Sequence, residues 1–520
     1  MRRLIIEAPW LIAVAIGAGL LWAATPDMNH PWGSNWPHYF ESAHFFWDPT
    51  SAYFGWRTPL YPLALAILGK SMGYASAAHT IAQLSAGLLV LSAGALGRTW
   101  QGPMAGAIAA LGVPMMQCAV ESASWTNMYP LAAASAALAI AVGATLSRWP
   151  TLLGAIVGGL LAGLAWKLNH LGLVTIPIVG GLLVVGLTRP AHGFKKMAMA
   201  GLFTMGIGAA AGLDHWVIDH WSVPQEDLST QVIQRRREEL ERIRDSSDPK
   251  FSACTDFDPK PLNLPELTNA CAMQFLDSNY GTVQAEDCGP SPSMLLILVP
   301  LALLPGVRAK DWAERLRTSA SSALIIGGAA GAVYLGAAWT SYSEKYILAF
   351  VPALLAMLPV AGARLGAMVG RAADKPILGS RLGLAGAAVV GIMVWPKPTG
   401  LHADAPRVER SWEMLSGQVA QWAQDTVGAD DLLLDCVPLR VDLAMLPKTV
   451  PSRFGIGTQE PCSGWIQAPP SVSGQVYMLT RTFPELAHTA PENITAQGWR
   501  RLQSYDAEHH LWVHSASRAD

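Results

Sequence analysis

Three carboxylates and three histidines lie close together between residues 25 and 58, soon after the first apolar run of the chain. A carboxylate can take up the proton of an attacking hydroxyl or amine, and histidine is also a common ligand of divalent metals. Tryptophans in the same stretch are typical of the membrane–water interface. The stretch therefore predicts either an acid–base site or an aromatic belt at a membrane edge. The residues are Asp27, Glu41 and Asp48, then His30, His38 and His44, then Trp32, Trp36, Trp47 and Trp56.

Three cations elsewhere are candidates for holding a phosphate. Arg57 begins the segment RTPLYP, Lys167 ends an apolar run, and Lys345 comes directly before another apolar run. Arginine offers phosphate a two-pronged fork and lysine a point charge. Long cationic side chains near a membrane edge also extend to lipid headgroups without any specific ligand. Each of the three therefore has two interpretations, as a phosphate ligand or as a cation that only extends to lipid headgroups.

The elements that must position these residues are membrane helices. Of the 520 residues 51% are hydrophobic and only 14% are charged, whereas soluble domains carry about 25% charged residues. A crossing helix needs roughly 17–25 apolar residues, and about eleven runs approach that length. They lie near residues 9–24, 77–97, 104–118, 129–147, 150–166, 171–187, 197–213, 293–306, 319–338, 346–362 and 382–396.

Charge asymmetry sets the orientation, because short cytoplasmic loops collect Lys and Arg. An apolar stretch at 59–73 must then lie along the membrane or dip into it, since a full crossing would move Arg2 and Arg3 to the other side. We predict a polytopic α-helical membrane protein with its N-terminus inside and its C-terminus outside. The basic loops lie around Arg98, Arg148, Arg189–Lys196, Arg308–Arg317 and Arg364–Arg381, and the alternate connections are 119–128, 167–170 and 339–345.

Three segments fall outside in this topology, namely 25–58, 214–291 and 397–520. The transmembrane domain is then 1–396, and 397–520 is predicted to be a small α/β or α+β domain. Its expected helix is 408–425, and its expected strands are 431–436, 475–480 and 509–514.

Cysteine usage fits an oxidising compartment on that outer side. Cys436 and Cys462 in the C-terminal domain are a candidate disulfide. Cys118 is placed in a membrane run, which leaves an odd number of external cysteines and one of them without an intramolecular partner. Sequence alone leaves the pairing of Cys254, Cys271 and Cys288 open.

Metal binding is the minority interpretation of the histidines, and no cofactor is assigned. His38 and His44 with a nearby acid could hold a divalent cation, but their spacing is irregular. A second polar cluster at the end of the 197–213 run is explained more simply by helix capping and interface solvation. Its members are Asp214, His215, Asp219 and His220.

The chain resembles the GT-C class of membrane glycosyltransferases, which use a polyprenyl-phosphate sugar donor, and within it the aminoarabinose and mannosyl transferases. The shared architecture is a first helix, a long acidic and aromatic external loop, many helices and an external soluble domain. Residues 57–62 match the R/K-x-P-x-Y-P motif of the class. Lys345-Tyr346 before a proline-containing apolar run, and Tyr129-Pro130 after a short external loop, are also similar.

The resemblance implies that a sugar is transferred from a lipid phosphate on the external face. A carboxylate would take the acceptor proton, and cations would stabilise the departing phosphate. The implied bases are Glu41 or Asp48, with Asp27 third. The implied donor-phosphate ligands are Arg57, Lys345 and Lys167, and the implied substrate-lining residues are Trp36, His38, Tyr39, Tyr61 and Tyr346.

One departure from the class keeps other functions open. Asn35 stands four residues before Tyr39, where the class commonly has its acid. The chain could therefore be a non-catalytic subunit of a larger complex. A transporter or flippase is less favoured, because the apolar runs hold almost no charge and show no paired interruptions.

The expected partners are a lipid-linked sugar donor, membrane lipids, and an acceptor that is a glycan, a lipid or a protein. Nucleic acid is not expected, since the net charge is -2 and no basic patch is present. The chain lacks a Walker A loop, a GxSxG motif and an HExxH motif, which argues against three common enzyme classes. The expected location is a bacterial inner membrane with the C-terminal domain in the periplasm.

Overall fold

The computed structural model divides the chain into two compact units, which are described separately. The first unit is Met1–Pro26, Ile81–Ser124 and Met128–Thr399, and the second is Asp27–Thr80, Trp125–Asn127 and Gly400–Asp520. The structure describes residues 2–24, 36–47, 49, 53, 58–189, 193–224, 317, 319–328, 348–394, 418–419, 421–437, 451–454, 462–482, 489–505 and 507–514.

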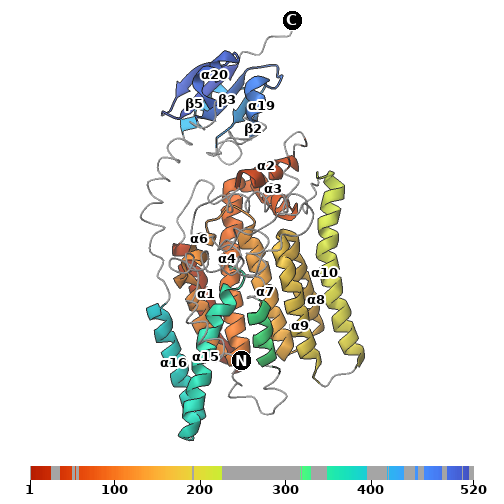
Figure 1. Cartoon of the computed structure of the whole chain (residues 1–520), viewed down its shortest axis with the longest axis vertical. Coiled ribbons are helices and arrows are strands. Elements are labelled where there is room, and N and C mark those ends of the chain that lie inside the picture. Colours follow the sequence, from red (N-terminus) through yellow and green to blue (C-terminus); the bar gives the residue numbers. More distant parts are fainter. Residues whose placement is uncertain are drawn as a thin grey trace, which may run out of the picture. The chain divides into compact units, whose positions relative to one another are not determined.

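The first unit is built of apolar helices that lie side by side along their length (Figure 1). Its described elements are α1 (Arg2–Ala24), α4 (Tyr74–Gln101, which begins in the second unit), α5 (Pro103–Gly112), η1 (Val113–Met115), α6 (Gln117–Ser122), α7 (Tyr129–Arg148), α8 (Leu152–Leu168), η2 (His170–Val174), α9 (Thr175–Leu187), α10 (Gly193–Trp221), α15 (Val351–Ala372) and α16 (Pro376–Val394).

Five of the described helices are long and apolar enough to cross a membrane, and several shorter apolar helices accompany them. The larger number expected from the sequence is not reached within the described residues for two reasons. The 293–306 run and much of the 319–338 run lie outside them, and the runs near 104–118, 150–166, 171–187 and 382–396 form shorter apolar helices. The five are Glu7–Ala24, Ser76–Gln101, Tyr129–Arg148, Gly193–Trp221 and Val351–Ala372. The chain is thus a helical membrane protein.

Three boundaries differ from the predicted runs. The 104–118 run is broken, because the α5 helix gives way to the short η1 turn around Pro114. The α10 helix continues to Trp221, so Asp214 lies within a helix and not in an external loop. The α15 helix continues to Ala372, so Arg364 is buried inside the bundle and not in a cytoplasmic loop. Arg364 was mistaken for a loop residue because a charge usually ends an apolar run.

Small residues let neighbouring helices approach closely, as is typical in membranes. On α16, a Cβ added at Gly383 would lie 2.0 Å from the Gly362 carbonyl oxygen of α15. On α4, a Cβ at Gly97 would lie 2.6 Å from the Ala105 carbonyl oxygen of α5. An ion pair adds to this packing where Arg98 donates to Glu7 of α1 at 2.8 Å.

The second unit begins with two short helices, α2 (Trp36–Phe45) and α3 (Leu60–Met72), which pack on each other. The α3 helix confirms the predicted 59–73 helix and, with 13 residues, is too short to cross a bilayer. Pro59 caps its start and Pro62 lies in its first turn, where a missing N–H costs little. It ends at Gly73, whose positive φ of 84° suits glycine.

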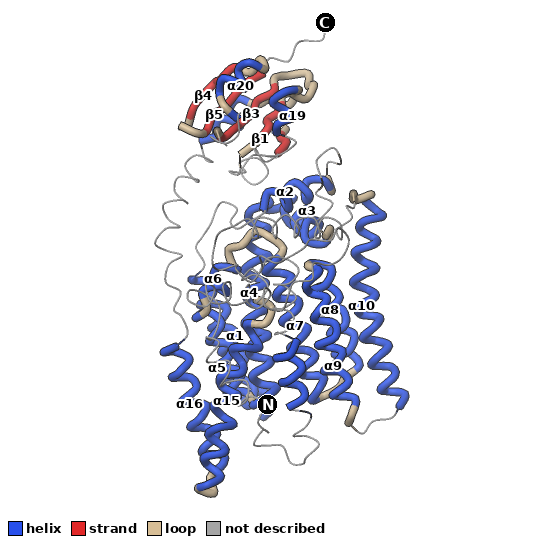
Figure 2. The backbone as a smooth tube through the Cα atoms, viewed as in Figure 1, coloured by secondary structure: helices blue, strands red, loops and turns tan. Residues whose placement is uncertain are grey.

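The C-terminal part of the second unit is a mixed five-stranded sheet in the order β2-β1-β3-β5-β4 (Figure 2). The first three positions are parallel and the last two join antiparallel. Three strands confirm those predicted, whereas β2 and β4 are short or exposed and gave little periodic signal. The strands are β1 (Leu432–Asp435), β2 (Ser452–Phe454), β3 (Val476–Arg481), β4 (Arg500–Ser504) and β5 (His509–His514).

Both faces of this sheet are covered. Leu432 and Leu434 of β1 pack on one face with α19 (Cys462–Gln467) and α20 (Pro491–Ala496). Leu433 points to the other face and packs with Ala423 and Val427. All of β1 is therefore buried, which explains its continuous apolar sequence.

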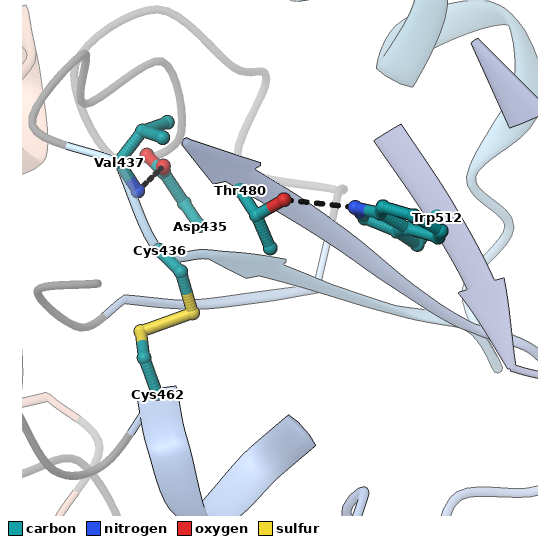
Figure 3. The surroundings of a disulfide bond; sticks show 6 residues. All are labelled: Asp435, Cys436, Val437, Cys462, Thr480 and Trp512. Carbon is teal, nitrogen blue, oxygen red and sulfur yellow. Dashed lines mark hydrogen bonds between the residues drawn. A yellow bond between two sulfur atoms is a disulfide. The ribbon is translucent and has the colours of Figure 1, made fainter. Parts of the chain in front are cut away.

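A disulfide fixes the end of β1 to the start of α19. Cys436 and Cys462, the pair put forward from the sequence, are bonded with their Cα atoms 5.7 Å apart (Figure 3). Beside it the Val437 N–H donates to Asp435 at 3.2 Å, and the Trp512 indole donates to Thr480 at 2.8 Å (Figure 3). The bond therefore ties the end of β1 to the start of α19.

Cys118 corrects the cysteine assignment made from sequence. It lies on α6 and is also disulfide-bonded, to a cysteine outside the described residues. Cys118 is therefore paired, and the apolar run predicted to hold it is interrupted after α5. The prediction of one unpaired external cysteine counted Cys118 as unpaired, so that prediction loses its basis.

Candidate functional site

The α2–α3 pair brings together two of the residues expected to line a substrate. Tyr39 of α2 and Tyr61 of α3 meet edge to face, with ring centroids 5.1 Å apart. Both rings are fully buried. The RTPLYP motif leads into α3, and its tyrosine, Tyr61, packs against α2. Two segments of the acidic and aromatic loop are therefore in contact.

The Tyr61 hydroxyl is buried and, within the described residues, has no hydrogen-bond partner. Burial, and secondly the neighbouring Tyr39, raise the pKa of the Tyr61 phenol well above its ordinary value. The phenol therefore stays neutral and keeps its O–H. A buried donor without a partner usually has a specific reason to be there.

Aromatic and cationic side chains extend this pair of helices. The Trp47 indole donates to the Ala66 carbonyl oxygen at 3.0 Å, and the Lys70 ammonium lies 4.2 Å from the centroid of the Trp47 ring. His44, a candidate metal ligand, meets the Tyr74 ring edge-on at 6.5 Å. Gly69 must be glycine, because a Cβ there would lie 2.6 Å from the Tyr74 ring.

Most of the charged candidates fall outside the described residues. Asp27, Asp48, Arg57, Lys345 and Tyr346 are among these. Trp36, His38 and Glu41 belong to the α2 helix, but their side chains are not described. Their assigned roles remain predictions. Within the described residues, no group of three or more His, Cys, Asp or Glu side chains could hold a metal ion.

Lys167 is placed clearly, at the end of α8 in the first unit. Its ammonium nitrogen lies 2.9 Å from Oδ2 of Asp214 on α10. The same ammonium lies 4.6 Å from the centroid of the Trp166 ring. Lys167 is therefore held between a carboxylate and an aromatic face, and is not a lone cation at a membrane edge.

Two acids matter more in the structure than the sequence indicated. Asp214 was interpreted as an exposed cap, yet it is only 5% exposed because α10 runs past it. Glu121 was passed over altogether. It is half-buried on α6, three residues after the disulfide-bonded Cys118, and Ser122 and Ser124 beside it are fully buried. The signal available in the sequence was an acid followed by two serines directly after an apolar run.

Comparison with known proteins supports the fold of the whole chain. No family model matches it, and no curated protein matches by sequence. The structure of ArnT from Cupriavidus metallidurans in the apo state has a TM-score of 0.56 at 14% identity, covering 98% of both chains. The same enzyme bound to undecaprenyl phosphate has a TM-score of 0.53 at 13% identity, also covering 98% of both chains.

A third similar structure is the Archaeoglobus fulgidus oligosaccharyltransferase in its apo form, at 13% identity. It has a TM-score of 0.46 and covers 99% of this chain and 74% of that one. That score is too low to add to the argument. ArnT is a GT-C glycosyltransferase. The resemblance to the GT-C class is therefore confirmed, and the chain has the GT-C membrane fold.

Proposed function

We propose that the chain transfers a sugar from a polyprenyl-phosphate donor to an acceptor at the external membrane face. The observation that carries this proposal is the fold match over 98% of both chains to an ArnT structure bound to undecaprenyl phosphate. The contact between Tyr39 and Tyr61, the tyrosine of the RTPLYP motif, also supports the proposal.

The chemistry assigns a role to each type of residue. A carboxylate from Glu41, Asp48 or Asp27 takes the proton of the acceptor hydroxyl or amine as the donor bond breaks. Arg57 and Lys345 balance the charge that develops on the departing lipid phosphate. The acceptor is a glycan, a lipid or a protein, and the soluble domain helps to bind it.

The disulfides support an external position for the parts that carry them. Disulfides persist in oxidising compartments and are rare in the cytosol. Cys436 and Cys462 lie in the C-terminal domain, and Cys118 directly precedes the 119–128 connection that the charge pattern assigned to the outside. The proposed location is therefore a bacterial inner membrane with the C-terminal domain in the periplasm.

A non-catalytic role within a larger complex is the second candidate, because Asn35 stands where the class commonly has an acid. In that case the chain would keep the fold and the lipid-phosphate site without a base. A co-purifying subunit with its own active site would support this candidate.

The site is tested by replacing its carboxylates. The full-length chain and its Asp27→Asn, Glu41→Gln, Asp48→Asn triple variant are incubated in membranes with polyprenyl-phosphate sugars, and the transferred product is measured by mass spectrometry. We expect the triple variant to lose transfer at least 100-fold, because general-base catalysis contributes about 10²–10⁴-fold. Full activity of a folded triple variant would remove these acids from the mechanism.

The control is Asp219→Asn, which changes an acid that is largely exposed on α10 and paired with His215. It should transfer at the wild-type rate. Uptake of the donor into liposomes without any glycan product would instead favour a transporter.

A further inference from the structure

The α8 and α10 helices form a close seam in the first unit (Figure 1). A Cβ added at Gly159 of α8 would lie 2.0 Å from the Phe203 carbonyl oxygen of α10. One turn on, a Cβ at Gly163 would lie 2.8 Å from the Ala210 Cβ. Two glycines four positions apart on α8 thus let the two backbones come close together.

Lys167 and Asp214 lie on the same faces of α8 and α10 as the residues that form this seam. Lys167 follows Gly163 by four residues on α8, and Asp214 follows Ala210 by four residues on α10. Residues four apart lie on one face of a helix, so the ion pair closes the seam at its end.

The pair is asymmetric in burial. The Asp214 side chain is 7% exposed, whereas that of Lys167 is 23% exposed. Oδ1 of Asp214 is buried without a hydrogen-bond partner among the described residues, and Lys167 pairs with its other oxygen. Leaving a buried carboxylate without its cation is costly, so the pair keeps the Lys167 ammonium beside Asp214.

The lysine ammonium keeps donors to spare. It carries three N–H groups, and Asp214 occupies one of them while the Trp166 ring covers part of the rest. A lysine side chain gives up rotamer entropy when it is fixed, and this loss opposes ligand binding. Asp214 and Trp166 impose that cost before any ligand arrives, which leaves a pre-positioned cation at the partly exposed end of the seam.

We propose that Asp214 is a positioning residue, and that it holds the Lys167 ammonium to bind the phosphate of the lipid-linked donor. This inference rests on the proposed function and names a residue pair of the first unit that would act on the donor's phosphate. It differs from a purely structural bridge, because it requires that loss of Asp214 weakens phosphate binding through Lys167 and not only stability.

The test is a double-mutant cycle on the full-length chain in nanodiscs, with undecaprenyl phosphate as the probe. Binding is measured directly for the wild type, Asp214→Asn, Lys167→Met and the double variant, and thermal unfolding is measured alongside. We expect Lys167→Met to weaken binding about tenfold or more, as for the loss of one charged hydrogen bond. Asp214→Asn should weaken it several-fold, but by less than twofold in the Lys167→Met background.

Asp219→Asn on the same helix is the matched control and should bind the probe as the wild type does. Wild-type affinity in folded Asp214→Asn and Lys167→Met variants would overturn the inference and leave the proposed function standing. An Asp214→Asn effect of equal size in both backgrounds would also overturn it. Absence of binding to the wild type would overturn the proposed donor class and this inference together.

Discussion

At the residue scale, the structure shows the surroundings of a few candidate residues, while the roles assigned to them stay predictions. Tyr39 and Tyr61 were chosen from sequence as substrate-lining residues, and they do meet. Lys167 was chosen as a lone cation, but its partner Asp214 lies 47 positions away in the chain, beyond the reach of any local pattern. A long-range ion pair cannot be predicted from spacing, because it depends on how two helices pack.

The Tyr61 hydroxyl gives a test at this scale. Tyr61→Phe removes a buried O–H that has no partner among the described residues, so the free energy of unfolding should change by less than about 1 kcal/mol. If the hydroxyl contacts the donor, the KM for the donor should rise several-fold at unchanged thermal stability. Unchanged kinetics would instead assign Tyr61 to packing alone.

At the element scale, the periodic and apolar helices were predictable and the irregular ones were not. The α7 and α8 helices and three strands of the sheet lie within two residues of their predicted ranges, whereas α16 begins six residues before its predicted run. The break after α5 was missed, because Pro114 and its neighbours keep the run apolar while the backbone leaves the helix. The end of α10 was missed because polar residues in its last turns mimic a loop.

The α15–α16 contact gives a test with a built-in control. A Cβ at Gly383 would lie 2.0 Å from the Gly362 carbonyl oxygen, whereas nothing lies within 4 Å of a Cβ at Gly386. Gly383→Ala should lower the free energy of unfolding by about 1–3 kcal/mol through overpacking. Gly386→Ala should be neutral or stabilising by up to about 1 kcal/mol, because alanine favours helix.

Thermal unfolding of both variants in the same detergent checks this pair. Equal melting temperatures for the two variants would contradict the close approach of α15 and α16.

At the scale of the whole molecule, composition and charge pattern identified the membrane class, and the motifs identified the fold class before any coordinates. The side on which each segment lies stays a prediction from the basic loops, and the disulfides at Cys118 and Cys436–Cys462 are what an outer position would predict. Five candidates lie outside the described residues, so their roles in the site still rest on the sequence alone. They are Asp27, Asp48, Arg57, Lys345 and Tyr346.

The disulfides give a test at this scale. Protein made in a host with an oxidising periplasm should yield a linked Cys436–Cys462 peptide when it is alkylated and digested without reduction. Reduction of the bond should then cost the C-terminal domain about 3 kcal/mol, as expected for a closed loop of this order. Recovery of both cysteines as alkylated free thiols would place the domain on the reducing side.

The most direct measurement of the central claim is the fate of the donor in proteoliposomes that contain only this chain. A polyprenyl-phosphate sugar is supplied with a cell-envelope extract as acceptor, and the lipid and glycan products are counted by mass spectrometry. The account predicts that one polyprenyl phosphate is released for each sugar gained by the acceptor, and that the triple carboxylate variant stops both. Donor that stays intact beside wild-type protein able to bind undecaprenyl phosphate would contradict transfer and leave a binding subunit in its place.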